Sequence, residues 1–170
     1  RSEAGRNNTD DEDGDFSRQD ANSISLREHL IDQIQLAHLS HRDMSLVKLL
    51  LDSINDDGYL EQDLEEVVEN LPLELEVDLL ELETALKLIQ SLDPIGIGAR
   101  DLRECLLLQL KVLNADTPFL KTDIAMVKDH LALLAIKDFG KLRKQLICDE
   151  ASLKGAQWLI RQQNPRPGSE

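Results

Sequence analysis

The chain has 170 residues, a length that fits one domain of ordinary size or two small subdomains sharing a core. Nineteen basic and thirty-three acidic residues give a formal charge of −14, which argues against a globally basic nucleic-acid binder. Hydrophobic residues make up 41% of the chain but aromatic residues only 3%, which favours a Leu-rich helical core over a β-sandwich. We therefore expect an acidic, mostly α-helical protein.

Residues 1 to 23 differ from the rest of the chain. They carry seven acids and three bases, and Phe16 is their only large apolar side chain. Such a stretch buries too little surface to offset its chain entropy. We predict a disordered acidic tail over these residues.

From Ser25 to about residue 114, apolar residues recur every three or four positions, which is the spacing of amphipathic helices. The buried faces expected for successive helices are Leu26, Leu30 and Ile34; Val47, Leu50, Leu51 and Ile54; Leu64, Val67 and Val68; Leu79, Leu82, Leu86 and Ile89; Leu102, Leu106 and Leu110. We predict that Asp57-Gly58 ends the second of these helices, because glycine accepts the left-handed conformation of a helix end. Pro94 is predicted to end the fourth helix.

The last third of the chain has the pattern of a separate small bundle. Thr117-Pro118 predicts a helix start, and the buried faces expected after it are Ile124, Val127, Leu131 and Leu134; Leu142 and Leu146; Leu153, Ala156 and Ile160. Leu88–Pro94 and Leu159–Pro165 both read as a helix end followed by Asp-Pro or Asn-Pro. We predict an all-α fold of two packed helical subdomains, with four to five helices in residues 24–114 and three in residues 115–168.

No group of reactive side chains has the spacing of a catalytic or metal site. The stretch from Ser53 places Asn55 and Asp57 at calcium-loop positions, but Leu64 stands where that loop needs a bidentate Glu. Cys105 lies among leucines, as a small buried hydrophobic residue does. We expect no enzyme activity, cofactor, metal or small-molecule substrate.

The cysteine count and the hydropathy of the chain indicate where the protein works. Its two cysteines form no Cys-x-x-Cys pair, which is typical of a reducing compartment. No apolar run approaches the roughly 20 residues that span a bilayer. We expect a cytoplasmic protein without a membrane partner.

Charge is distributed unevenly along the chain. Residues 49–86 contain thirteen acids and no Lys or Arg, whereas residues 137–166 contain seven bases and three acids. The acidic stretch fits either a solvated face or a patch complementary to a basic partner. The basic stretch fits the polar side of the last helices or contact with a phosphate backbone. Two alternatives therefore stay open: a helical DNA-binding domain that uses residues 137–166, and a generic acidic adaptor.

Four segments together resemble one known family. They are DDGYL (Asp56–Leu60), LDPIGIGARDLRECLLLQL (Leu92–Leu110), KDFGKL (Lys137–Leu142) and NPRPG (Asn164–Gly168). Their order is that of the core-binding domain of sigma-54 (sigma N), a sigma factor of bacterial RNA polymerase. The resemblance covers about Ser25 to Gly168.

The resemblance implies a pair of all-α subdomains that docks on core RNA polymerase, including the flap region of the β subunit. This docking would tether the sigma factor for activator-dependent transcription initiation in the bacterial cytoplasm. Promoter DNA and the ATPase activator would be engaged only through other regions of the full-length factor. We therefore expect the chain to be a fragment of such a factor.

Within the matched motifs we separate contact residues from scaffold residues. Arg100, Asp101, Arg103 and Glu104 are polar residues at a turn before a helix, and they are our candidates for polymerase contact. Their alternative role is local capping and ion pairing. The residues expected to shape turns and helix ends are Gly58, Tyr59, Leu60, Asp93, Pro94, Gly96, Gly98, Asn164, Pro165, Pro167 and Gly168.

Overall fold

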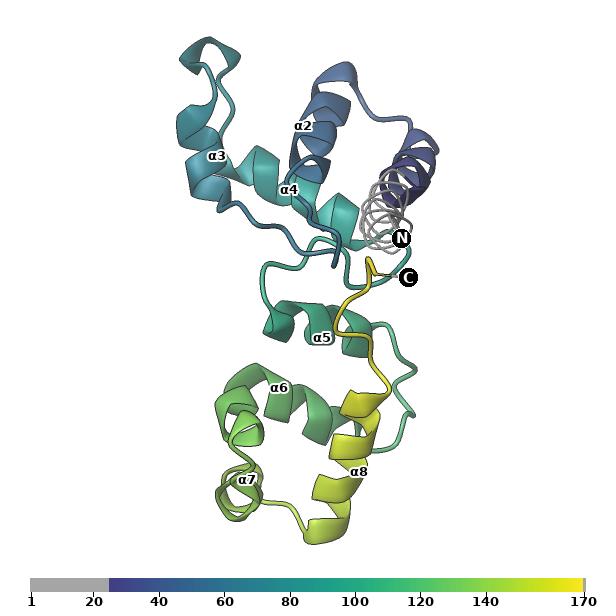
Figure 1. The fold of residues 1–170 in the computed structure, drawn as a ribbon, viewed down its shortest axis with the longest axis vertical. Coiled ribbons are helices and arrows are strands. Elements are labelled where there is room, and N and C mark those ends of the chain that lie inside the picture. Colours follow the sequence, from purple (N-terminus) through teal and green to yellow (C-terminus); the bar gives the residue numbers. More distant parts are fainter. Residues whose placement is uncertain (1–24, 170) are drawn as a thin grey trace, which may run out of the picture.

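Figure 1 presents the computed structural model of the chain, which describes residues 25–169. The tail predicted over residues 1–23 lies outside the described residues. Within the described range the regular structure is helical, and extended pairing is limited to isolated bridges that join Ile54 to Leu60 and Tyr59 to Ala99. The predicted all-α fold class is confirmed.

The first described helix covers residues 25–35. It is followed by α2 (His41–Leu51), α3 (Leu64–Asn70), the short 3-10 helix η1 (Leu73–Leu75), α4 (Leu79–Gln90), α5 (Leu102–Lys111), α6 (Leu120–Ala135), α7 (Phe139–Leu146) and α8 (Glu150–Arg161).

Polar N-caps explain where most of these helices begin. Each cap side chain accepts a hydrogen bond from a backbone N–H of the first helical turn, which otherwise lacks a partner. Ser40 caps α2, and the Asp caps of α3, α4, α5, α7 and α8 are Asp63, Asp78, Asp101, Asp138 and Asp149.

The end predicted for the second helix at Asp57-Gly58 is wrong, because α2 already ends at Leu51. The side-chain oxygen of Asn55 accepts hydrogen bonds from the backbone N–H groups of Asp57 and Tyr59, both at 3.0 Å. The N–H of Asn55 donates to the carbonyl of Tyr59 at 2.9 Å. Side chains that bond the backbone in this way compete with helix formation. The stretch therefore forms a tight turn.

The helix start predicted at Thr117-Pro118 also differs. The helix α6 begins at Leu120, after Phe119 in the left-handed conformation with φ 66°. A Cβ atom added to Gly155 of α8 would collide with the ring of Phe119, so the ring lies directly on that glycine. This packing of α6 on α8 explains a start that local capping rules do not predict.

The helices gather in two clusters, with α5 between them (Figure 1). The N-terminal cluster consists of residues 25–35, α2, α3 and α4, and its most buried side chains are Leu30, Ile34, Val47, Leu50, Leu82, Leu86 and Ile89. The C-terminal cluster consists of α6, α7 and α8, and it packs around Met126, Leu142, Leu153 and Ala156. Each buried Leu or Ile stabilises the fold by roughly 1.5–3 kcal/mol.

Helix α5 contacts both clusters. Its Leu106 and Leu110 pack with side chains of α6 and α8. At its first turn, Glu104 accepts a hydrogen bond of 3.1 Å from the side chain of Gln90 in α4. The division of the chain at residue 114 therefore stays a prediction.

Candidate functional site

Three segments that are distant in sequence meet where the two helical clusters join. They are residues 55–60, 93–99 and 164–168, and we call the region of their contact the clasp. The C-terminal segment runs from α8 past α5 to reach it, in yellow in Figure 1. Motifs that the sequence presents separately are thus parts of one structural unit.

Backbone hydrogen bonds hold the three segments of the clasp together. The N–H of Gly98 donates to the carbonyl of Gly58 at 2.8 Å. The N–H of Gly168 donates to the carbonyl of Asp57 at 3.0 Å. The turn around Gly58 therefore bonds both the segment before α5 and the C-terminal segment.

Two glycines of the clasp have conformations and surroundings that exclude a side chain. Gly58 has φ +98° and Gly96 has φ +105°, in a region that L-residues rarely adopt. A Cβ on Gly58 would lie 2.8 Å from Ile97, and one on Gly96 would lie 2.9 Å from Gln109. The ring of Pro167 would lie 3.2 Å from the Cβ atom on Gly58 and 3.3 Å from the Cβ atom on Gly96. The proline ring therefore fills the space that the two glycines leave.

Gln109 attaches the C-terminal segment to α5. Its side-chain amide donates to the carbonyl of Asn164 at 2.6 Å and accepts from the N–H of Asn164 at 2.7 Å. The hydroxyl of Tyr59 donates to the carbonyl of Pro165 at 2.7 Å. Burial raises the pKa of the nearby Cys105 thiol. The thiol therefore stays protonated at neutral pH and has the properties of a packing residue.

A second glutamine makes the matching contact in the N-terminal cluster. The side chain of Gln33 donates to the carbonyl of Asp93 at 2.5 Å and accepts from its N–H at 2.8 Å. Asp93 and Asn164 both precede a proline. The similar helix ends in the sequence thus share a structural feature, in which a distant glutamine amide holds the residue before the proline.

Three of the four candidates for polymerase contact are engaged locally. Asp101 is the N-cap of α5 and accepts from the N–H of Glu104 at 2.8 Å. Arg100 donates to the two carboxylate oxygens of Glu104 at 3.0 Å and 2.6 Å. Burial alone would raise the pKa of Glu104, but the hydrogen bonds from Arg100 outweigh it and lower that pKa. These contacts support capping and ion pairing as their role.

Arg103, the fourth candidate, is exposed and has no ion pair with any residue of the described range 25–169. It borders a hollow of about 340 Å³ whose wall also includes Leu107, Leu108 and Lys111 of the same helix. A free guanidinium beside partly exposed leucines can contact a partner without breaking an existing bond.

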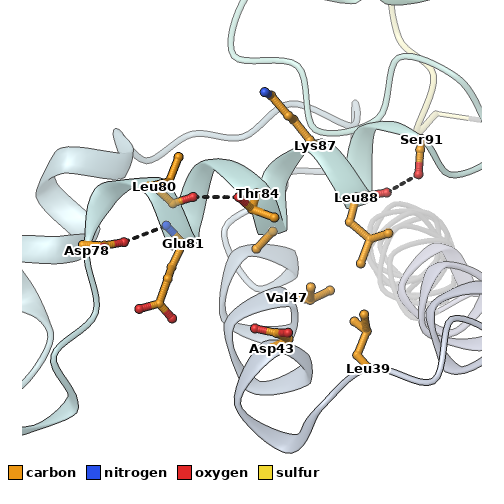
Figure 2. A pocket seen from close by; sticks show the side chains of 11 residues that line it. Leu39, Asp43, Val47, Asp78, Leu80, Glu81, Thr84, Lys87, Leu88 and Ser91 are labelled. Carbon is orange, nitrogen blue, oxygen red and sulfur yellow. Dashed lines mark hydrogen bonds between the residues drawn. The ribbon is translucent and has the colours of Figure 1, made fainter.

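A larger groove, which the sequence analysis did not predict, lies between α2 and α4. It has a volume of about 600 Å³. Figure 2 shows Leu39, Val47 and Leu88 pointing toward one another at its floor. Leu80, at the start of α4, lines the groove and is 68% exposed. The groove is therefore an apolar surface open to solvent.

Acidic groups border one end of this groove. Asp43 and Asp78 line it together with Glu81 (Figure 2). Arg42 donates to the two carboxylate oxygens of Glu81 at 2.8 Å and 2.9 Å, which ties α2 to α4 at the rim. The hydrogen bond from Arg42 is also the main cause that lowers the pKa of Glu81. The sequence signal for the groove is Leu80, which lies off the buried stripe of its helix.

The described residues contain no group of three or more His, Cys, Asp or Glu side chains that could hold a metal ion. No helix within that range is long and apolar enough to cross a bilayer. The described residues thus form a small all-α domain. Its candidate binding features are the groove between α2 and α4 and the exposed Arg103.

Comparison with known proteins identifies the family. The pattern of the family described as "Sigma-54 factor, core binding domain" matches residues 15–170. The RNA polymerase sigma-54 factor of Pseudomonas aeruginosa is 44% identical over 161 residues, which cover 95% of this chain and 32% of that protein. The factors of Azotobacter vinelandii and Escherichia coli are 43% and 39% identical, over 95% and 85% of this chain.

The chain belongs to the sigma-54 factor core binding domain family. It spans about a third of the length of the curated relatives that it matches, with 32% coverage of the Pseudomonas aeruginosa protein.

Proposed function

We propose that this chain is a non-enzymatic docking module that binds core RNA polymerase and thereby holds a sigma-54-type factor on the enzyme for transcription initiation. The family match over residues 15–170 carries this proposal. We place this function in the bacterial cytoplasm and propose that the flap region of the polymerase β subunit is part of the docking surface. Promoter DNA and the ATPase activator would be engaged by other regions of a full-length factor.

Two surfaces are suited to this docking. The groove between α2 and α4 combines an apolar floor with Asp43 and Asp78 at one end. A polymerase segment with apolar side chains and a basic residue would complement both features. The hollow beside Arg103 offers a cation instead, for an acidic group of the polymerase.

Titration of the labelled 170-residue chain with core RNA polymerase tests the proposal, with duplex DNA as a parallel ligand. We expect saturable binding to the polymerase that weakens as salt rises, because exposed charges are screened. Binding to DNA alone would favour the alternative of a DNA-binding domain through residues 137–166. Binding to neither ligand would favour an adaptor for some other basic partner.

Reversing the charge at Arg103 should weaken polymerase binding about tenfold, or ~1.4 kcal/mol, because an interface charge would then meet a like charge. The side chain of Arg103 makes no hydrogen bond or ion pair with residues 25–169, so the melting curve of Arg103→Glu should match that of the parent chain. Lys121→Glu is the control, since Lys121 is an exposed cation on α6. An equal loss of binding and of stability would assign Arg103 a structural role.

A charge placed in the apolar groove should also weaken polymerase binding by about tenfold, because the incoming apolar group would be buried against a carboxylate. The test variant is Leu80→Glu. Leu73→Glu is the matched control, since Leu73 is 93% exposed and lies outside the groove. If both variants bind like the parent chain, the groove is not part of the polymerase interface.

A further inference from the structure

We propose that the acidic segment Asp10–Phe16 of this chain binds a basic groove on its own C-terminal cluster. The proposal is independent of polymerase binding. It rests on the construction of that groove, on the composition of the segment and on the length of chain that joins them.

The groove is formed where the ends of α6 and α8 meet the start of α7. It has a volume of about 210 Å³ and is lined by Leu134, Lys137, Phe139, Gln157, Ile160 and Arg161. Leu134 and Ile160 are half-buried, and Phe139 is 39% exposed. Lys137 and Arg161 are exposed. An apolar floor is thus combined with two cations.

More positive charge adjoins this groove. Lys141 and Lys144 follow along α7 and line a neighbouring hollow with Gly140, Gln145 and one acid, Asp138. Within residues 25–169, none of Lys137, Lys141, Lys144 and Arg161 forms an ion pair. In a chain with a net charge of −14, this is a local concentration of unpaired cations. Such a surface attracts an anionic partner.

The tail sequence has the complementary composition. The segment DDEDGDF, Asp10–Phe16, places five acids directly before the only large apolar residue of residues 1–23. In the proposed complex the ring of Phe16 is buried against the apolar floor, and the acids form ion pairs with Lys137 and Arg161. A nucleic-acid backbone would satisfy the cations but would leave the apolar floor exposed. The observations therefore favour the acidic aromatic segment as the occupant.

The connecting chain reaches the Arg161 end of the groove when it is nearly fully extended. Leu26 and Arg27 share a hollow with Asp56, and the neighbouring Asp57 bonds Gly168 at 3.0 Å. Gly168 is seven residues beyond Arg161, which therefore lies within about 25 Å of it at ~3.6 Å per extended residue. The nine residues from Phe16 to Ser25 reach at most about 32 Å by the same rule. Covalent attachment also raises the effective concentration of the segment.

Amide NMR spectra of the full 170-residue chain test the proposal. In the tail variant, Asn replaces Asp10, Asp11, Asp13 and Asp15, and Gln replaces Glu12. We expect the amide signals of Phe139, Ile160 and Arg161 to shift between the parent chain and this variant. Phe16→Ala alone should shift the same signals. Added salt should move the signals of the parent chain toward their positions in the tail variant, and should move those of the variant much less.

A reciprocal pair of variants provides the matched control. Lys137→Glu combined with Arg161→Glu should shift the amide signal of Phe16, whereas Lys154→Glu should not, because Lys154 does not line the groove and pairs with Glu150. The proposal is overturned if neutralising the tail shifts only signals near residue 25. It is also overturned if the groove shifts depend on protein concentration, which would indicate a second copy. Duplex DNA that moves the groove signals equally in the parent and tail variants would overturn it as well.

Discussion

Replacing Gly168 with alanine is expected to destabilise the chain by about 1–3 kcal/mol, the usual range for an added methyl group in a tightly packed site. A Cβ at this position would lie 2.7 Å from both the carbonyl oxygen of Asp56 and the N–H nitrogen of Gly58. Both are backbone atoms of a turn, so no side chain can rotate away. Urea denaturation should give a lower free energy of unfolding, and the amide proton of Gly168 should exchange faster, because its bond to Asp57 is displaced.

The same substitution at Gly140 should have the opposite effect. Gly140 lies in the first turn of α7, and a Cβ there would meet no atom within 4 Å. Alanine in a helix is favoured over glycine by roughly 0.5–1 kcal/mol. Gly140→Ala should therefore raise the free energy of unfolding. Equal effects of the two substitutions would contradict the contact between the C-terminal segment and the turn around Gly58.

The second large effect is expected at Asp123, whose stability contribution should depend on pH. Asp123 lies on α6 with 0% exposure, and neither of its carboxylate oxygens has a hydrogen-bond partner among residues 25–169. Burial raises the pKa of Asp123 from 3.8 to about 7. The folded chain therefore keeps this proton between about pH 4 and pH 7, where the unfolded chain loses it. Stability from this group is present below pH 4 and falls by about 1.4 kcal/mol or less per pH unit up to pH 7.

Asp123→Asn removes the ionisation and should remove this slope. At pH 8 the variant is expected to be more stable than the parent chain, because it buries no charge. The measurement is the free energy of unfolding from urea denaturation between pH 5 and pH 8. Asp129→Asn is the control, since Asp129 lies on the same helix but is exposed. A pH profile of Asp123→Asn parallel to that of the parent chain would contradict an ionisable buried carboxylate.

Helix positions were predictable because their signals are local. Five Asp residues and one Ser cap helices, and each stands just before an apolar stripe of helical spacing. The one helix end and the one helix start that were predicted wrongly depend on contacts outside the helix itself. Asn55 bonds the backbone of the next turn, and Phe119 packs on Gly155.

The candidate site was predictable only in part. The motifs named Gly58, Gly96 and Gly168, but nothing in their spacing indicates that they meet around Pro167. Gln109 lies on α5 next to a leucine stripe, where a polar residue is expected to face solvent. Its amide is instead buried, because the backbone of the C-terminal segment supplies both hydrogen-bond partners. Such contacts are set by the tertiary fold and not by local sequence.

The clasp also has a consequence for how the chain folds during synthesis. Tyr59 and its hydrogen-bond partner Pro165 are separated by 106 residues. The N-terminal cluster has its own core, so it can collapse early, but the turn after α2 lacks its partners in the C-terminal segment until residues 164–168 have left the ribosome. Contacts of such long sequence separation form late, because closing the loop costs entropy before any bond is gained. The closure of the turn around Tyr59 therefore waits for a segment that is synthesised 106 residues later.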